Sequence, residues 1–446
     1  MLRRKMLDRL MEWKARSGHK SLLLTGARQT GKTFIVDEFG KTYENYVRIN
    51  FLENDSFARI FEGDRSVDSM VSRIALMVRG AKMVPGKTLL FLDEIQECPD
   101  ARTALKFFTI DGRFDVIASG SMLGVKYAEV KSNPVGYIDR LSMYPLDFEE
   151  FLWAEGVPEE IISEVRGCLR KREPIDGLVF DRLQELFRWY TVVGGMPEVV
   201  SEFVESRDME GVIRLQRTIV ADYTDDISKY ATGKDRIYAK EALRSIPAQL
   251  SKRNKKFMYV DIGGSGSPRA STYISSISWL QDAGIAYLCN NVSAPSLPFD
   301  PDLDCFKIYM LDTGLLISIM GDHVSKAILD DGLFVNEGAI AENVVADMLA
   351  CQEVRLLYFE KKGALEIDFM LDLEGCATAV EVKSGNSRRS RSLAAVMSER
   401  YGASRGIKLR NGNVESKDGV DYLPIFAACF LDELGGRRSC SARTGS

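Results

Sequence analysis

The sequence predicts an α/β fold in which helices cover both faces of a parallel sheet. The first observation is a short uncharged run, 22–25, which is typical of a buried strand; a glycine turn and a helix that begins near Phe34 follow it. The second observation is another buried run, 89–92, that ends in two acidic residues. Strands that alternate with helices and end in polar residues are the order of a nucleotide-binding α/β sheet.

A glycine-rich turn joins the first strand to the next helix. Gly26, Gly31, Lys32 and Thr33 fit the pattern G-x-x-x-x-G-K-[ST]. In such a turn backbone N–H groups surround a phosphate, the lysine reaches the β- and γ-phosphates, and the threonine hydroxyl meets Mg²⁺. A chance glycine–lysine turn is the alternative, but the place between a strand and a helix favours a P-loop NTPase sheet. The predicted nucleotide-binding residues of this segment are Gly26, Ala27, Arg28, Gln29, Thr30, Gly31, Lys32, Thr33 and Phe34.

The two acids that follow the second buried run complete this prediction. Asp93 stands at the carboxyl end of the expected strand, where it would hold Mg²⁺ together with Thr33. Glu94 would polarise the water that attacks the γ-phosphate. We therefore predict ATP and Mg²⁺ as cofactors and Lys32, Asp93 and Glu94 as catalytic residues. A nucleotide-binding switch would need Asp93 but not Glu94.

Other strand ends carry polar residues that could face the γ-phosphate. Asn50 lies near the end of a second predicted strand, and Ser119 and Ser121 follow the strand predicted at 115–118. A buried, hydrogen-bonded asparagine and a glycine turn capped by serines are the alternatives. Arg140 is a candidate arginine finger for a neighbouring subunit, although an ordinary surface arginine is the simpler explanation.

The overall composition indicates a globular protein of two or three domains. The chain has 446 residues, of which 45% are hydrophobic and 28% are charged, and a formal net charge of -5. A nucleic-acid surface would therefore be a local patch. Eight cysteines are scattered without a C-x-x-C pair, which predicts reduced thiols and no structural zinc. Because the sequence shows no signal peptide and no run of about 20 apolar residues, we predict a cytoplasmic protein without a membrane partner.

The middle of the chain has the order of a winged-helix module. A predicted helix, a glycine-rich loop at 263–267, a second helix and two strands follow one another between 235 and 320. DNA or RNA is a candidate partner, because basic residues outnumber acids in the first part of this module. Packing against an ATPase core or a protein partner is the alternative. The basic residues are Arg236, Lys240, Arg244, Lys252, Arg253, Lys255 and Lys256.

The third part of the chain combines an acid-bearing helix with a two-stranded hairpin. Glu342 lies on the predicted helix, and alternation along the two strands brings Asp368 toward Glu381 and Lys383. Asp368 and Glu381 would hold Mg²⁺ with Glu342, and Lys383 would orient a water or stabilise the developing phosphorane charge. A hairpin with a solvated face of paired charges is the alternative. The half-buried strands favour a nuclease-type fold and leave metal-dependent cleavage open.

A series of motifs resembles one protein family over nearly the whole chain. The motifs include G-A-R-Q-T-G-K-T, L-F-L-D-E-I-Q, V-G-G-M-P-E-V-V, E-I-D-F and E-V-K-S-G. Together they look like the prokaryotic AAA+-type ATPases that carry a C-terminal domain of unknown function. The resemblance implies an ATPase core, a winged-helix segment and a C-terminal domain similar to the PD-(D/E)xK nucleases. It also implies that Lys32 and Thr33 are the phosphate-loop pair and that Asp93 and Glu94 are the magnesium and water pair. The nuclease-like set that it implies is Glu342, Asp368, Glu381 and Lys383.

Two function hypotheses follow. The first is a Mg²⁺-ATPase whose nucleotide state repositions the winged helix and the nuclease-like domain on nucleic acid. The second is an ATP-dependent switch or scaffold whose inactive C-terminal domain serves protein binding or oligomerisation. The predicted segments are an AAA+-type core at 1–155, a helical linker or lid at 156–234, a winged-helix-like module at 235–320, a nuclease-like domain at 330–434 and a disordered tail at 435–446.

Overall fold

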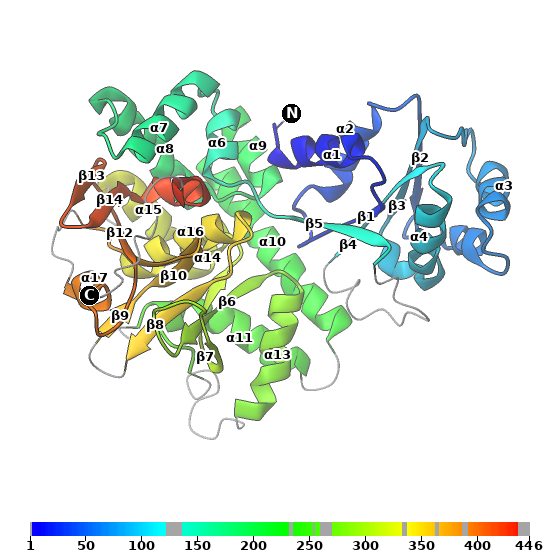
Figure 1. Ribbon diagram of the computed structural model, residues 1–446. Helices are drawn as coiled ribbons and strands as arrows, with labels where there is room; N and C mark the ends of the chain where they lie inside the picture. Colours follow the sequence, from blue (N-terminus) through cyan, green and yellow to red (C-terminus); the bar gives the residue numbers. More distant parts are fainter. Residues whose placement is uncertain are drawn as a thin grey trace. The chain divides into compact units, whose positions relative to one another are not determined.

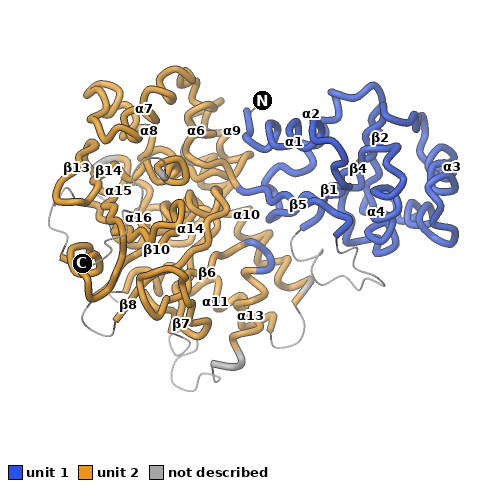
Figure 2. The backbone as a smooth tube through the Cα atoms, in the orientation of Figure 1, with its two compact units in different colours: residues 1, 3–144, 282–284 blue, residues 2, 145–281, 285–446 orange. Residues whose placement is uncertain are grey.

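The computed structural model describes residues 2–121, 136–231, 235–252, 255–258, 270–331, 337–361, 365–385 and 391–435. The chain divides into two compact units, which Figure 2 distinguishes by colour. Unit 1 comprises residues 1, 3–144 and 282–284, and unit 2 comprises residues 2, 145–281 and 285–446. The first unit therefore ends before the predicted boundary at 155. The predicted boundaries inside unit 2 stay predictions, and residues 436–446 of the predicted tail lie outside the described residues.

Unit 1 is built on one five-stranded sheet with the order β2-β3-β4-β1-β5 (Figure 1). Each neighbouring pair of strands is parallel. The carboxyl ends of these strands therefore share one edge of the sheet, where a ligand can meet several of them. The strands are β1 (Ser21–Gly26), β2 (Asn45–Asn50), β3 (Thr88–Asp93), β4 (Asp115–Ser121) and β5 (Ile138–Met143).

Helices cover both faces of this sheet, as predicted. Buried residues of α1 and α2 pack with Leu22, Leu24 and Phe91 on one face. Residues of α3 and α4 pack with Leu23 and Leu90 on the other. This alternation of buried residues explains why the strands read as continuous apolar runs. The helices are α1 (Lys5–Ala15), α2 (Lys32–Gly40), α3 (Val67–Met77) and α4 (Pro99–Asp111), with 3-10 turns η1 (Asp55–Phe61) and η2 (Ile95–Glu97).

The helix α3 is shorter than its apolar pattern. Apolar and polar residues alternate at helical period over 67–84, but α3 ends at Met77. Val78 is extended, and Gly80 has a φ of 78°. A glycine in the left-handed region cannot continue an α-helix, so the local glycine overrides the apolar periodicity.

Unit 2 begins with a group of helices. Asp147 caps the first of them, because its side chain accepts a hydrogen bond from the backbone N–H of Glu150 at 2.9 Å. The helices are α6 (Phe148–Ala154), α7 (Glu159–Lys171), α8 (Gly177–Val193), α9 (Pro197–Ser206) and α10 (Met209–Tyr230). Aromatic rings of Phe148, Phe187 and Tyr190 pack together inside this group.

The helices and strands of the predicted winged-helix order are present, and the predicted glycine loop at 263–267 lies outside the described residues. β6 and β7 pair antiparallel, as a wing would. However, β6 also pairs with β8 from the C-terminal part of the chain, so the hairpin belongs to a four-stranded sheet with the order β7-β6-β8-β9. The elements are α11 (Asp235–Leu250), α13 (Ala270–Asp282), β6 (Ala286–Val292), β7 (Pro301–Met310), α14 (Thr313–Met320) and α15 (Asp322–Asp331).

The C-terminal part forms a second five-stranded sheet with the order β10-β11-β12-β14-β13. The hairpin β10–β11 turns at Glu374 and Gly375, whose φ angles of 53° and 76° are both positive. Such a pair is typical of a two-residue hairpin turn. The predicted strand over 365–371 is divided at Asp368, because β9 pairs with β8 and β10 pairs with β11. The elements are α16 (Glu337–Cys351), β8 (Leu357–Lys361), β9 (Leu365–Ile367), β10 (Phe369–Leu373), β11 (Cys376–Val382), α17 (Arg391–Val396), β12 (Arg405–Arg410), β13 (Glu415–Lys417), β14 (Val420–Pro424), η3 (Ile425–Phe430) and η4 (Asp432–Gly435).

Two chain-wide expectations can be compared with the described residues. No helix among them is both long and apolar enough to span a membrane. The cytoplasmic location stays a prediction. Six of the described cysteines form no disulfide, but Cys376 is disulfide-bonded, so the prediction of reduced thiols is wrong at that position. Cysteine spacing alone could not indicate this bond, because a disulfide depends on which segments meet in space.

Candidate functional site

The glycine-rich turn lies between the end of β1 and the start of α2, as predicted. Gly31 precedes the first residue of α2 with a φ of 89°, and Gln29 has a φ of 61°. A Cβ atom on Gly26 would lie 2.3 Å from the carbonyl oxygen of Met143, so only glycine fits there. Two residues in left-handed conformations within this turn fold the chain sharply, which is typical of loops whose backbone N–H groups bind an anion.

Lys32 is folded back into its own turn. Its Nζ atom donates to the carbonyl oxygens of Gly26 at 3.1 Å and of Ala27 at 2.7 Å, and the residue is 9% exposed. Burial lowers the pKa of Lys32 to about 8, although the nearby carboxylates of Glu94 and Asp93 act to raise it. An anionic phosphate in the turn would favour the charged ammonium, which is the role predicted for this residue.

The magnesium pair predicted from the sequence meets in the structure. The Thr33 hydroxyl lies 3.2 Å and 3.3 Å from the two carboxylate oxygens of Asp93, although the two residues belong to different elements. Asp93 is 1% exposed and ends β3. The Ser119 hydroxyl donates to the same carboxylate from the end of β4. A hydroxyl and a buried carboxylate at this spacing are the oxygen ligands that Mg²⁺ takes beside a nucleotide.

Arg48 contacts this carboxylate and was not predicted. Its Nη2 atom lies 2.8 Å from Asp93 Oδ2, and its Nη1 atom lies 3.4 Å from Asp37. The residue comes from β2, where it stands between the buried Val47 and Ile49. An arginine between two apolar residues of a predicted buried strand is the sequence signal that could have indicated it, because strand alternation places it on the face of Asp93.

Glu94 directly follows the buried acid in an uncommon backbone conformation. Its φ is 56° and its ψ is 49°, a left-handed conformation that is rare for glutamate. The side chain accepts a hydrogen bond from the amide of Gln96 and is partly exposed. Non-glycine residues held in this region cluster at functional sites. The left-handed backbone turns the chain away at the end of β3, and the role of Glu94 as the water-polarising base stays a prediction.

The other predicted nucleotide residues lie around the same edge. Asn50 is opposite Asp93 in the β2–β3 register, but its amide donates to Glu53 at 2.9 Å and its oxygen accepts from the backbone of Leu52. The side chain is thus hydrogen-bonded, as in the alternative, but it is only partly buried. Ser121 is opposite Gly26 in the β1–β4 register. The nucleotide contacts of these residues stay predictions, as do those of Arg28, Gln29 and Phe34, whose ring is 48% exposed.

Arg4 supports the turn from outside the motif. Its guanidinium donates to the carbonyl oxygen of Thr30 at 3.1 Å and to that of Tyr144 at 2.7 Å. Thr30 is fully buried, and its hydroxyl donates to Ala27 at 2.9 Å. A buried arginine therefore fixes the turn against the end of the sheet. Sequence reasoning missed this residue, because nothing in a basic N-terminal segment indicates which arginine turns inward.

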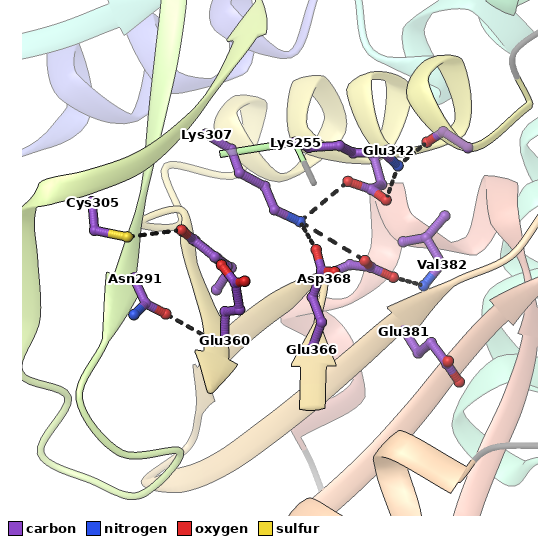
Figure 3. Close-up of polar contacts among 12 residues, drawn as sticks. Lys255, Asn291, Cys305, Lys307, Glu342, Glu360, Glu366, Asp368, Glu381 and Val382 are labelled. Atoms are coloured by element: carbon purple, nitrogen blue, oxygen red, sulfur yellow. Dashed lines mark hydrogen bonds and ion pairs between the residues drawn. The ribbon is translucent and has the colours of Figure 1, made fainter. Parts of the chain in front are cut away.

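The predicted C-terminal set also meets, but lysines join it. Glu342 of α16, Asp368 between β9 and β10, and Glu381 of β11 are 3%, 5% and 7% exposed. Figure 3 shows Lys307 of β7 reaching toward Glu342, Glu366 and Asp368. Sequence reasoning did not single out Lys307, and it placed Lys255 in the basic patch rather than beside Glu342, with which it pairs. In the sequence Lys307 is a single polar residue within a strand, and nothing near it indicates that carboxylates surround it in the fold.

The ionisation of this set follows from burial and from the lysines. Burial and the nearby Glu342 raise the pKa of Asp368 to about 7, against the opposing effect of Lys383 and Lys307. Burial acts to raise the pKa of Glu342 as well, but Lys307 and Lys255 outweigh it and hold that pKa low. Among the described residues no group of three or more His, Cys, Asp or Glu side chains is arranged to hold a metal ion. The predicted metal role of Glu342, Asp368 and Glu381 stays a prediction.

Comparison with known proteins identifies the first domain. Residues 18–152 match a family model described as "AAA domain". The chain carries an AAA-type P-loop domain. Residues 184–325 and 337–427 match two models that are each described as a domain of unknown function, DUF8612 and DUF4143. The predicted AAA+-type core is thereby confirmed, whereas the nuclease-like character of the C-terminal domain stays a prediction.

Several solved structures are similar to this chain at low identity, and no curated protein matches it. The Walker-type ATPase of Pyrococcus abyssi is 12% identical, and the match covers 72% of this chain and 96% of that chain with a TM-score of 0.44. The Aeropyrum pernix ORC1 protein in complex with DNA is 16% identical, with coverage of 74% and 92% and a TM-score of 0.29. AMPPCP-bound DnaA from Aquifex aeolicus is 13% identical, with coverage of 62% and 86% and a TM-score of 0.27.

Proposed function

We propose that this chain is a Mg²⁺-dependent ATPase whose nucleotide site is the carboxyl edge of the unit 1 sheet. The observation that carries the proposal is the contact of the Thr33 hydroxyl with both carboxylate oxygens of Asp93, at 3.2 Å and 3.3 Å. These residues lie on α2 and β3, and only a folded site brings them together. A bound magnesium ion would neutralise phosphate charge there.

The residues of the chain divide the work of the site. Lys32 contacts phosphate oxygens as an ammonium, and the backbone of the turn donates N–H groups. Asp93 and Thr33 orient the metal, with Ser119 holding the carboxylate of Asp93 in place. Glu94 accepts a proton from the attacking water. Arg48 must leave Asp93, or share it, when a metal ion arrives, because both cations compete for one carboxylate.

The loss of the Thr33 hydroxyl tests the proposal. In Thr33→Val a methyl group replaces the hydroxyl at nearly constant volume, so the metal loses one oxygen ligand. We expect the Mg²⁺ concentration that gives half-maximal ATP turnover to rise about tenfold or more. Thr33→Ser, which keeps the hydroxyl, is the matched control and should resemble the native protein. An unchanged magnesium requirement in Thr33→Val would remove the site assignment.

Unit 2 enters the proposal as the part that responds to the nucleotide state. Its C-terminal domain serves there as a coupling or partner-binding domain rather than as a nuclease. Glu342, Asp368 and Glu381 are each under a tenth exposed, so a phosphodiester has little access to them. Protein partners or other copies of the chain would bind unit 2.

Arg140 is exposed on β5, which is consistent both with an arginine finger and with an ordinary surface arginine.

Nucleic-acid binding by α11 is a second candidate function. Arg236, Lys240 and Arg244 are spaced four residues apart on α11, so they share one face of the helix. The acids of this helix point elsewhere, because Asp235 accepts from Ser275 and Glu241 accepts from Tyr273 on α13. A row of cations without acids between them can follow a phosphate backbone.

The predicted basic patch is smaller than the sequence indicates. Lys255 pairs with the buried Glu342, and Cys305 raises the pKa of Lys256 through a hydrogen bond. Lys255 therefore contacts α16 and Lys256 contacts β7, so both lysines have partners inside unit 2. A hollow of about 380 Å³ is lined by Arg217 and Arg244 together with Asp225, and Arg217 pairs with Asp322, so the hollow does not extend the positive surface.

Salt dependence tests the role of the α11 row. Each lost phosphate contact lowers the slope of log Kd against log salt concentration by about 0.9. We expect the double variant Arg236→Gln with Arg244→Gln to bind a labelled DNA duplex more weakly and with a slope reduced by about 2. A control that changes the exposed Arg400 and Lys417 to glutamine should retain the native slope. Equal slopes in both variants would show that α11 does not contact phosphate.

A further inference from the structure

We propose that the ammonium of Lys307 takes the place of a divalent cation in the C-terminal carboxylate cluster. The cluster comprises Glu342, Glu366, Asp368 and Glu381 together with Lys255, Lys307, Lys383 and Lys408. In this arrangement the cluster is a metal-free ion-pair network that holds β7 against the C-terminal domain. The nuclease resemblance implies a metal at these acids, and the residues present do not fit one.

The first support is the position of Lys307. Its side chain is 1% exposed and lies 2.8 Å from Glu366, 3.5 Å from Glu342 and 3.9 Å from Asp368. Figure 3 shows the three carboxylates around its Nζ atom. A lysine that is buried to this degree needs counter-charges on several sides, because an isolated ammonium in the interior is strongly unfavourable. Lys307 is therefore a permanent, buried member of the cluster.

The second support is the charge of the cluster. Four carboxylates and four ammonium groups are linked by ion pairs of at most 3.9 Å. The lysines at its two buried ends, Lys307 and Lys408, are each 1% exposed. A divalent cation would add two positive charges to a set that is already balanced, in which Glu366 and Lys383 are part-exposed and the other six side chains are largely buried. A metal site of the nuclease type instead needs an excess of carboxylate.

The third support is that the carboxylate oxygens already have donors. Tyr309 donates to Glu342 Oε2 at 3.0 Å, and Lys255 pairs with the other oxygen of Glu342. The backbone N–H of Val382 donates to Asp368 Oδ2 at 2.8 Å, and Lys307 faces Oδ1. A metal ion would have to displace these donors and bring waters with it. The Oε2 atom of Glu381 accepts no hydrogen bond among the described residues, but it lies 3.6 Å from Lys408.

The cluster also has a structural consequence. Lys307 belongs to β7, the strand that follows the helices α11 and α13, whereas its three carboxylates come from α16 and from the β9–β10 junction. The parallel pairing of β6 with β8 joins the same two segments. The charge network and the shared sheet thus hold the segment from α11 to β7 together with the C-terminal domain.

Manganese binding tests the proposal directly. The full chain carrying Asp93→Asn, without nucleotide, is titrated with Mn²⁺ and followed by electron paramagnetic resonance, so the unit 1 site does not contribute. We expect Glu342→Gln in this background to leave the amount of bound Mn²⁺ unchanged. One Mn²⁺ per chain that disappears with Glu342→Gln would overturn the proposal. Because Asp93 is replaced in every sample, neither result depends on whether the proposed ATPase function is correct.

Removal of the internal cation gives the second test. Lys307→Met in the same background leaves the buried carboxylates with an excess negative charge. We expect its melting temperature to fall and to rise again with millimolar Mn²⁺, whereas the parent chain and the control Lys417→Met show no Mn²⁺ effect. An unchanged melting temperature in Lys307→Met would overturn the proposal. If Lys307→Met does not fold, the titration of the parent chain and of Glu342→Gln still decides.

Discussion

Lys32→Ala is expected to lower the affinity for ATP about 100-fold, because one charged donor to phosphate is worth up to about 3 kcal/mol. In the free protein the Nζ atom already lies inside the turn, held by the carbonyl oxygens of Gly26 and Ala27. Alanine removes this ammonium without filling the space it leaves. The measurement is a titration with a fluorescent ATP analogue in the presence of Mg²⁺.

A neighbouring lysine provides the control for this prediction. Lys41 follows the last residue of α2 and pairs with Glu38 at the surface. Lys41→Ala removes the same kind of side chain just after the end of this helix without changing the turn, so it should retain native affinity. Equal affinities of Lys32→Ala and Lys41→Ala would mean that phosphate does not bind in this turn.

Glu94→Gln is expected to reduce ATP turnover by about 10² to 10⁴-fold while ATP binding remains. Glutamine keeps the shape of the side chain but cannot take a proton from water. Its backbone must still adopt a φ of 56°, which the native glutamate also adopts, so the substitution adds no new strain. Turnover is measured as phosphate release at saturating ATP, and binding by the same fluorescent titration.

The result for Glu94 also separates the two function hypotheses. Glu97→Gln is the matched control, since this acid lies three positions further on and is exposed. If the native protein binds ATP but releases no phosphate, the chain is a nucleotide switch. If the native protein turns ATP over and Glu94→Gln does so equally well, another residue is the base. Loss of turnover in Glu94→Gln alone identifies the hydrolytic residue.

The parts of the fold and site that could be predicted are those with a local signal. The turn between 26 and 33 is specified by its own glycines, which permit the left-handed conformation seen at Gly31. Asp93 could be placed because two acids directly follow an uncharged apolar run, which is typical of the end of a buried strand. The hairpin register around Glu374 and Gly375 followed from the turn residues themselves. In each case the physical cause lies within a few residues of the feature.

The parts that could not be predicted depend on contacts between distant segments. Arg48 and Arg4 are ordinary arginines in the sequence, and only the fold shows that they contact Asp93 and Thr30. Lys307 is similar, because its carboxylates come from segments that follow it along the chain. The pairing of β6 with β8 is likewise a long-range contact, and the local helix–strand order that predicted a winged-helix module gives no sign of it. Periodicity indicates which face a residue occupies but not what it meets there.

Arg4 bears on how the protein should be produced. This residue precedes α1, and its two hydrogen bonds fix the phosphate turn to the end of β5. A truncated version that starts inside α1 would retain every residue of the motif. Because it lacks Arg4, it would hold the phosphate turn less rigidly. Weak ATP binding by such a truncation would then reflect the missing support, not an absent activity.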